Sequence, residues 1–189
     1  MTDGLTADDK QVLLRLARQA LESGVRGEKL PPLNRESLSP CLRADGAAFV
    51  TLTEGGQLRG CIGALEAYQP LAEDVREHAI AAALSDYRFP PVQVSELKGI
   101  HIEVSRLTAP VALEYAGPED LVAKLRPGVD GVILRDGNRR ATFLPQVWEQ
   151  LPDVEEFLAH LCNKMGASPD LWRRKHLDVQ IYQVEEFHE

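Results

Sequence analysis

The sequence has few cysteines and no long apolar run, and each shortage excludes a class of protein. Its three cysteines, Cys41, Cys61 and Cys162, are odd in number, far apart and without a Cys-x-x-Cys pair. They predict free thiols rather than a disulfide framework or a zinc knuckle. No apolar stretch approaches the roughly 18 residues of a membrane-spanning helix, and the first residues lack the charged and apolar regions of a secretory signal. We therefore expect a cytoplasmic protein without a membrane segment.

Sequence signatures for cofactors, metals and nucleic acid are missing as well. No glycine-rich phosphate loop or dinucleotide fingerprint occurs, and the five histidines show no metal-ligand spacing, so we predict neither a bound cofactor nor a metal. The formal net charge of −8 gives an acidic surface that repels a phosphate backbone. The basic run from Arg173 to Lys175 contains no aromatic residue and is better explained as a solvated helix face. Nucleic-acid binding is accordingly disfavoured.

Helix signals are strong at several places. Thr6 and Asp9 form a capping-box pattern before an apolar stripe that Gly24 can close, and Asp153 with Glu156 starts another helix that ends at Gly166. Further helices are predicted after Pro70, near residues 119–125, and from Ser168-Pro169 through Trp172, whereas the proline-rich stretch 25–43 predicts a long loop.

Strand signals alternate with these helices. Residues 47–52 and 58–65 flank Gly55-Gly56 and predict a hairpin, and a second hairpin turns at Asp136-Gly137. Single strands are predicted over residues 100–107 and 179–187. Helices and hairpins interleave without a strict βαβ rhythm, so we predict an α+β fold with mostly antiparallel sheet flanked by helices.

Cys61 is the candidate nucleophile. Strand alternation predicts that Arg59, Cys61 and Gly63 share one face, where the charge of Arg59 would lower the thiol pKa. His78 or His101 could serve as the general base. The alternative is that Cys61 is a small buried side chain that permits close packing between glycines. The local sequence leaves both interpretations open.

Candidate ligand-binding residues occur in other segments. Arg88 precedes Phe89-Pro90-Pro91, where a stiff backbone would hold a guanidinium ready for a carboxylate or phosphate; its alternative role is an ion pair with Asp86. Glu103 lies on a polar strand face, and Thr142 and Gln146 could line the same cleft or satisfy local backbone groups.

The chain resembles the AMMECR domain family, known in bacteria and archaea as AmmeMemoRadiSam system protein A. Five blocks carry the resemblance in the family's order: the LRGCIG motif at 58–63, LSDYRFPPV at 84–92, IEVSRL at 102–107, GVDGVIL at 128–134 and RRATFLPQVWEQLPD at 139–153. Arg139 stands where the family more usually has glycine, so Arg140 is the arginine that matches its Gly-Arg-Ala-Thr motif.

The resemblance implies two mixed lobes with the LRGCIG strand near an interlobe cleft, in a family usually described as lacking an established reaction. It also implies partners, a Memo-like protein and a radical S-adenosylmethionine enzyme. We expect residues 5–187 to form one AMMECR-type domain of two intimately connected lobes, because no linker-like stretch divides the chain. The cleft residues would be Cys61 as a tentative catalytic residue, with a ligand-binding set of Arg59, Arg88, Glu103, Arg140, Thr142 and Gln146. A binding protein, a cysteine-dependent enzyme and a protein-interaction scaffold all remain open.

Overall fold

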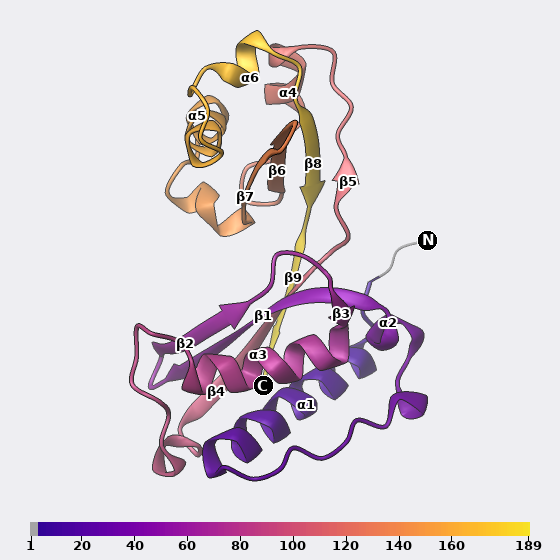
Figure 1. The fold of residues 1–189 in the computed structure, drawn as a ribbon, viewed down its shortest axis with the longest axis vertical. Coiled ribbons are helices and arrows are strands. Elements are labelled where there is room, and N and C mark those ends of the chain that lie inside the picture. Colours follow the sequence, from indigo (N-terminus) through magenta and orange to yellow (C-terminus); the bar gives the residue numbers. More distant parts are fainter. Residues whose placement is uncertain (1–3) are drawn as a thin grey trace. The chain divides into compact units, whose positions relative to one another are not determined.

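The computed structural model describes residues 4–189, which divide into two compact units (Figure 1). The first unit contains residues 4–108 together with Glu185–Glu189, and the second contains Ala109–Val184. Each unit has an antiparallel sheet, helices and a hydrophobic core of its own. The predicted α+β class with mostly antiparallel sheet is confirmed.

The sheet of the first unit is built around a central hairpin. Strand β1 pairs with β2 on one side and with β4 on the other, and the order is β2-β1-β4-β9 with β3 against the start of β1. Gly55 and Gly56 turn the hairpin at φ values of 57° and 78°, a backbone region that glycine enters without steric cost. The strands are β1 (Asp45–Glu54), β2 (Gln57–Gly63), β3 (Gln69–Pro70), β4 (Ile100–Leu107) and β9 (Val184–His188).

Helices α1 (Ala7–Arg26) and α3 (Leu71–Leu84) lie side by side against one face of this sheet (Figure 1). Alternate β1 residues, Ala48, Val50 and Leu52, are fully buried in the core that these helices complete. Gly60 belongs to the same face, where an added Cβ would lie 2.1 Å from the carbonyl oxygen of Ala82 in α3. The glycine therefore permits the close approach of helix and strand.

The second unit has a four-stranded sheet of order β5-β8-β6-β7. Its core lies between the sheet and the helices, where the rings of Trp148 and Phe157 stack at 3.6 Å between centroids. The elements are β5 (Val111–Ala112), α4 (Pro118–Lys124), β6 (Gly131–Asp136), β7 (Arg139–Phe143), η3 (Pro145–Glu149), α5 (Val154–Lys164), α6 (Leu171–Arg174) and β8 (Asp178–Tyr182).

The predicted helix starts and turns are largely confirmed. The Thr6–Asp9 capping box forms, Asp153 caps α5, and Gly137 turns the second hairpin at a φ of 59°. The first helix runs past Gly24 and ends at Arg26, because Gly27 supplies the left-handed C-cap at a φ of 68°.

Two other predictions were wrong, and a third was right about a short helix but not about its bounds. The predicted strand 179–187 is divided at Gln183, since β8 belongs to the second sheet and β9 to the first. The short helix predicted from Ser168-Pro169 starts only at Leu171 and extends to Arg174. The predicted loop 25–43 contains the short helices η1 (Arg35–Ser37) and α2 (Pro40–Arg43), capped by the side chains of Asn34 and Ser39.

Candidate functional site

Cys61 lies in the edge strand β2, and two side chains take the place of a neighbouring strand there. Its backbone N–H donates to Oδ2 of Asp86 at 2.9 Å, and its carbonyl oxygen accepts from Nη2 of Arg88 at 3.2 Å. An edge strand exposes unpaired backbone groups that invite pairing with another chain. The Asp86–Arg88 clamp, as we name these two side chains, closes that edge at Cys61.

Asp86 is the centre of the clamp. Only 5% of the residue is exposed, and its carboxylate also accepts from the backbone N–H, Nε and Nη2 of Arg88 at 3.1, 2.9 and 2.7 Å. These hydrogen bonds from Arg88, with that from Cys61, outweigh the effect of burial and hold the pKa of Asp86 well below its usual range. The carboxylate is therefore ionised at neutral pH.

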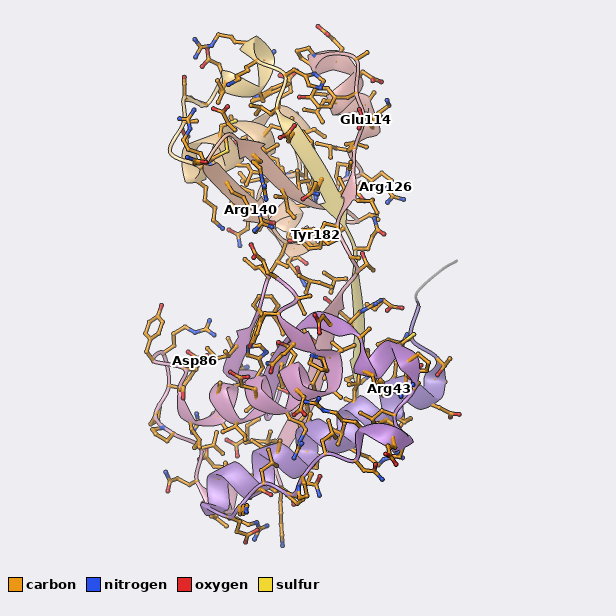
Figure 2. The ribbon with its side chains drawn as sticks, turned by 45° about the vertical axis from the view of Figure 1, so that its right-hand side comes forward. Arg43, Asp86, Glu114, Arg126, Arg140 and Tyr182 are labelled. Carbon is orange, nitrogen blue, oxygen red and sulfur yellow. The ribbon has the colours of Figure 1, made fainter. Side chains whose placement is uncertain are left out.

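The chain that follows α3 positions this clamp. The carbonyl of Asp86 accepts from the N–H of Phe89 at 3.1 Å, and the N–H of Val92 returns to the carbonyl of Ala83 at 2.9 Å. Pro90 and Pro91 restrict the backbone between these two bonds. Figure 2 labels Asp86 just beyond the end of α3. A short and stiff segment thus delivers both charged side chains to β2.

The thiol of Cys61 lies on the face of the sheet opposite the helices. It accepts a hydrogen bond from Oγ1 of Thr51 at 3.3 Å. In the strand register Thr51 pairs with Cys61 on β2 and with Glu103 on β4, so the three side chains form a row across three strands on one face, here called the Cys61 face. His101 belongs to this face one pair further along, opposite Thr53.

The candidate base His78 belongs to α3, which packs against the other face of the sheet. Its Nδ1 lies 3.2 Å from Oδ2 of Asp74, and the same oxygen accepts from the N–H of Ala48 at 2.9 Å. Burial acts to lower the pKa of His78, but the hydrogen bond and charge of Asp74 outweigh it and raise that pKa. His78 is therefore a partner of the buried Asp74, with the sheet between its helix and the Cys61 face.

Arg59 of β2 also binds the segment that follows α3. Its Nε and Nη2 donate to the Glu96 carboxylate at 2.7 and 3.2 Å, and its Nη1 donates to the carbonyl of Pro90 at 2.8 Å. The register of β2 shifts at this residue, because Leu52 pairs with Gly60 while Thr53 pairs with Leu58. Arg59 is thus the extra residue of a β-bulge, and strict alternation with Cys61 does not hold there.

Arg140, Thr142 and Gln146 belong to the second unit. Arg140 and Thr142 lie in β7, and Oγ1 of Thr142 is 3.1 Å from the hydroxyl of Tyr182, whereas Gln146 lies in η3. Figure 2 labels Arg140 and Tyr182 in this unit. That these residues join Cys61 in one cleft stays a prediction.

Thr51 and Glu96 were not predicted from the sequence: Thr51 contacts the thiol, and Glu96 holds Arg59. The ion pair of Arg88 with Asp86, the alternative given above, is present, but the bond from the Cys61 N–H to Asp86 was not foreseen. The spacing Asp86-x-Arg88 before Pro90-Pro91 was a usable signal for an ion pair, but its target on β2 lies 25 residues away. No local pattern identifies a contact of that separation.

Features of other functional classes are missing from residues 4–189. Within that range no group of three or more His, Cys, Asp or Glu side chains is placed to hold a metal ion, and no helix is long and apolar enough to cross a membrane. The basic run is neutralised locally, since Arg173, Arg174 and Lys175 form ion pairs with Glu155, Asp170 and Asp136.

Similar proteins cover nearly the whole chain. The AMMECR1 family model matches residues 14–187. A protein of Methanothermobacter thermautotrophicus is 42% identical over 186 residues, which are 98% of this chain and 96% of that protein. Protein MK0488 of Methanopyrus kandleri is 40% identical over 201 residues, covering 100% of this chain and 92% of its own. The crystal structure of the uncharacterized protein PH0010 from Pyrococcus horikoshii aligns with a TM-score of 0.78 at 36% identity, covering 98% of this chain and 93% of the other.

Proposed function

The chain belongs to the AMMECR1 family, and from that premise we propose that it binds a small anionic or polar ligand beside strand β2. We propose further that it acts with a Memo-like protein and a radical S-adenosylmethionine enzyme, the partners that the family resemblance implies. A cytoplasmic location is part of this proposal, supported by three free cysteines, which are typical of a reducing compartment.

The main support for ligand binding is that the Arg88 side chain is fixed in place but still has N–H donors that residues 4–189 leave free. Its Nε and Nη2 are occupied by Asp86 and Cys61, yet 44% of the side chain is exposed. A guanidinium has five N–H donors, and among the hydrogen bonds of residues 4–189 none uses Nη1 of Arg88. Two donors are thus held in a fixed place for an anion without loss of side-chain entropy on binding.

Catalysis by Cys61 is the weaker alternative. A thiol nucleophile needs a base within hydrogen-bond reach, and the group that contacts Sγ is the hydroxyl of Thr51, which is not a base. Glu103 is separated from Cys61 by the width of β1, and His78 lies on a helix against the other face. These positions favour a binding role for the region over a Cys-His mechanism.

The experiment titrates the folded protein with inorganic phosphate and with acetate while recording amide and Arg Nε–H NMR signals. We expect saturable shifts at Arg88, Cys61 and Asp86, lost in Arg88→Ala and kept in Cys61→Ala. Arg174→Ala is the matched control, because Arg174 is an exposed arginine paired with Asp170. Shifts that are the same in Arg88→Ala and in Arg174→Ala would contradict the proposal, and turnover lost only in Cys61→Ala would support the enzyme.

A protein-interaction scaffold is a second candidate, favoured by Tyr87. This side chain is 95% exposed, and it lies between the two residues of the clamp. Tyrosine and arginine on a rigid segment are typical anchors of protein interfaces. Light scattering of mixtures with the purified Memo-like protein and radical enzyme should show a complex that Tyr87→Ala weakens. Tyr68→Ala, at another exposed tyrosine, is the control; an equal effect of both variants would reject Tyr87 as an anchor.

A further inference from the structure

The sheet of the second unit also has one face turned away from its helices. Strand register places Arg140 opposite Arg135, and Arg135 opposite Asp178, in one row across β7, β6 and β8. The next row contains Thr142, Ile133, Gln180 and Ala112, reaching β5. Val132, Leu134 and Val179 point the other way, into the core. We call the surface with these two rows the Arg135 face.

A cavity of about 280 Å³ opens on the Arg135 face. Charged and polar side chains line it from three strands and from the segments beside them: Arg135, Asp178, Glu114, Gln180 and His176. Ala112 supplies exposed apolar surface, and Ile133 lies beneath the cavity with only 2% of the residue exposed. The volume is just below the roughly 300–1,000 Å³ of sites for drug-sized ligands, so it suits a smaller molecule. Figure 2 labels Glu114, which follows β5.

The charges around this cavity are separated instead of paired. Arg135 and Asp178 are direct cross-strand neighbours, an arrangement in which opposite charges normally attract one another. Among the ion pairs of residues 4–189, none joins these two side chains or uses Glu114. By contrast, Arg126, Arg139 and Lys175 of the same unit are all bound to aspartates. A cation therefore lies on one side of the cavity and two carboxylates lie on the other.

The backbone around the cavity is held by ring stacking, hydrogen bonds and strand pairing. The ring of His176 stacks on Tyr115 at 4.2 Å between centroids and 15° between planes. The hydroxyl of Tyr115 donates to the carbonyl of Leu177 at 3.0 Å and accepts from its N–H at 2.7 Å. Arg135 and Gln180 start from strands that are paired on both sides. The backbone positions of the lining residues are therefore fixed, while the side chains of Arg135, Asp178 and Glu114 are exposed.

We propose that this cavity binds a small zwitterion of the α-amino acid class with an apolar side chain. Its carboxylate pairs with Arg135, its ammonium group pairs with Asp178 and Glu114, and its side chain rests on the apolar surface at Ala112. Adjacent strands are about 4.8 Å apart, a spacing that lets one amino acid reach both charges. Among the residues that line the cavity, one arginine and two carboxylates disfavour a simple anion, and Arg135 disfavours a simple cation. The cavity belongs wholly to the second unit, so this proposal stands or falls independently of ligand binding at Arg88.

The test uses L-leucine as the probe, with amide NMR and calorimetry on the full chain. L-leucine should shift the signals of residues 112–114, 133–135 and 176–180 saturably. Leucine methyl ester lacks the carboxylate and N-acetyl-leucine lacks the ammonium group, and each should bind at least about tenfold more weakly, the cost of losing one charge-assisted pair.

Two variants assign these charges to residues. Arg135→Gln should weaken leucine binding about tenfold and abolish the preference for leucine over its ester, and Asp178→Asn should abolish the preference over N-acetyl-leucine. Arg173→Gln, at an exposed arginine of the same unit, should change nothing. The proposal is overturned if leucine causes no saturable shifts at millimolar concentration, if leucine and its masked forms bind equally, or if inorganic phosphate binds the cavity better. If Arg135→Gln does not fold, binding of the methyl ester and of N-acetyl-leucine to the unaltered protein, together with leucine binding to Asp178→Asn, tests the proposal.

Discussion

Replacing Asp86 by asparagine removes the charge of the clamp while keeping its shape. The carboxylate accepts four hydrogen bonds, one from Cys61 and three from Arg88. An amide has only one acceptor oxygen, so the groups at Oδ2, the Cys61 N–H and Nη2 of Arg88, lose their acceptor if the oxygen stays at Oδ1. A hydrogen bond to a charged group contributes about 1.5–3 kcal/mol, and an unsatisfied buried donor costs about 1–3 kcal/mol. Because Arg88 is 44% exposed, solvent compensates much of its share. We expect Asp86→Asn to lower the free energy of unfolding by about 2–4 kcal/mol.

The measurement is urea unfolding followed by two signals. Both tryptophans, Trp148 and Trp172, belong to the second unit, whereas the longest helices, α1 and α3, belong to the first. Circular dichroism therefore reports mainly the unit that contains Asp86, and fluorescence reports the other. If the chain unfolds as one cooperative unit, as expected for a single domain, Asp86→Asn shifts the dichroism and fluorescence transitions together. If only the dichroism transition shifts, the two units unfold separately.

The pH dependence gives an independent check with a definite sign. The folded pKa of Asp86 is lowered from its ordinary value near 3.8. Its contribution is therefore fully present above about pH 4 and is lost as the pH falls through the folded pKa, and Asp86→Asn should flatten this acid slope. Asp170→Asn is the matched control at an exposed ion pair, where we expect a smaller loss of stability because solvent screens the pair. A change in Asp86→Asn no larger than the control's would refute the reasoning.

Three further outcomes are expected. His78 has a raised pKa, so its contribution to stability is present below about pH 6.5 and is lost as the pH rises through the folded pKa. His78→Gln should remove this pH dependence of the melting temperature. If the pH dependence is unchanged in the variant, another group causes it. Gly60→Ala should lower the free energy of unfolding by about 2 kcal/mol or more, because the new Cβ would lie 2.1 Å from the backbone oxygen of Ala82. Gly4→Ala is the control and should be close to neutral in the same melting experiment, because the nearest atom to its Cβ is 3.8 Å away. Iodoacetamide should label Cys41 and Cys61 of the folded protein faster than Cys162, as followed by mass spectrometry, because Cys162 is fully buried and that burial raises its pKa. Labelling of Cys162 as fast as Cys41 would contradict this burial.

Local features were predictable from the sequence because their causes are local. The Thr6–Asp9 box, the Gly55-Gly56 turn and the Asp153 cap each depend on residues within a few positions. Strand 100–107 was predicted with its observed bounds, because it combines an alternating pattern with β-branched residues.

Non-local features were not predictable in the same way. The break at Gln183 arises because β8 and β9 pair in different sheets, and nothing in residues 179–187 records which strands lie beside them. The bulge at Arg59 depends on register with β1, and the contact between Asp86 and Cys61 depends on how α3 returns to β2. Residue types for the site were visible in the sequence, but their partners required the tertiary structure.

Strand β9 follows the whole second unit in the sequence and completes the sheet of the first unit. Glu189 holds Arg18 of α1 through its carboxylate, and its N–H donates to the carbonyl of Ile102. During synthesis, most residues of the first unit leave the ribosome before those of the second unit. The sheet of the first unit can nevertheless be completed only after the whole second unit has emerged, because β9 follows that unit. A stop codon directly after Val184 would remove nearly all of β9 from the first unit and leave the second unit, which ends at Val184, intact.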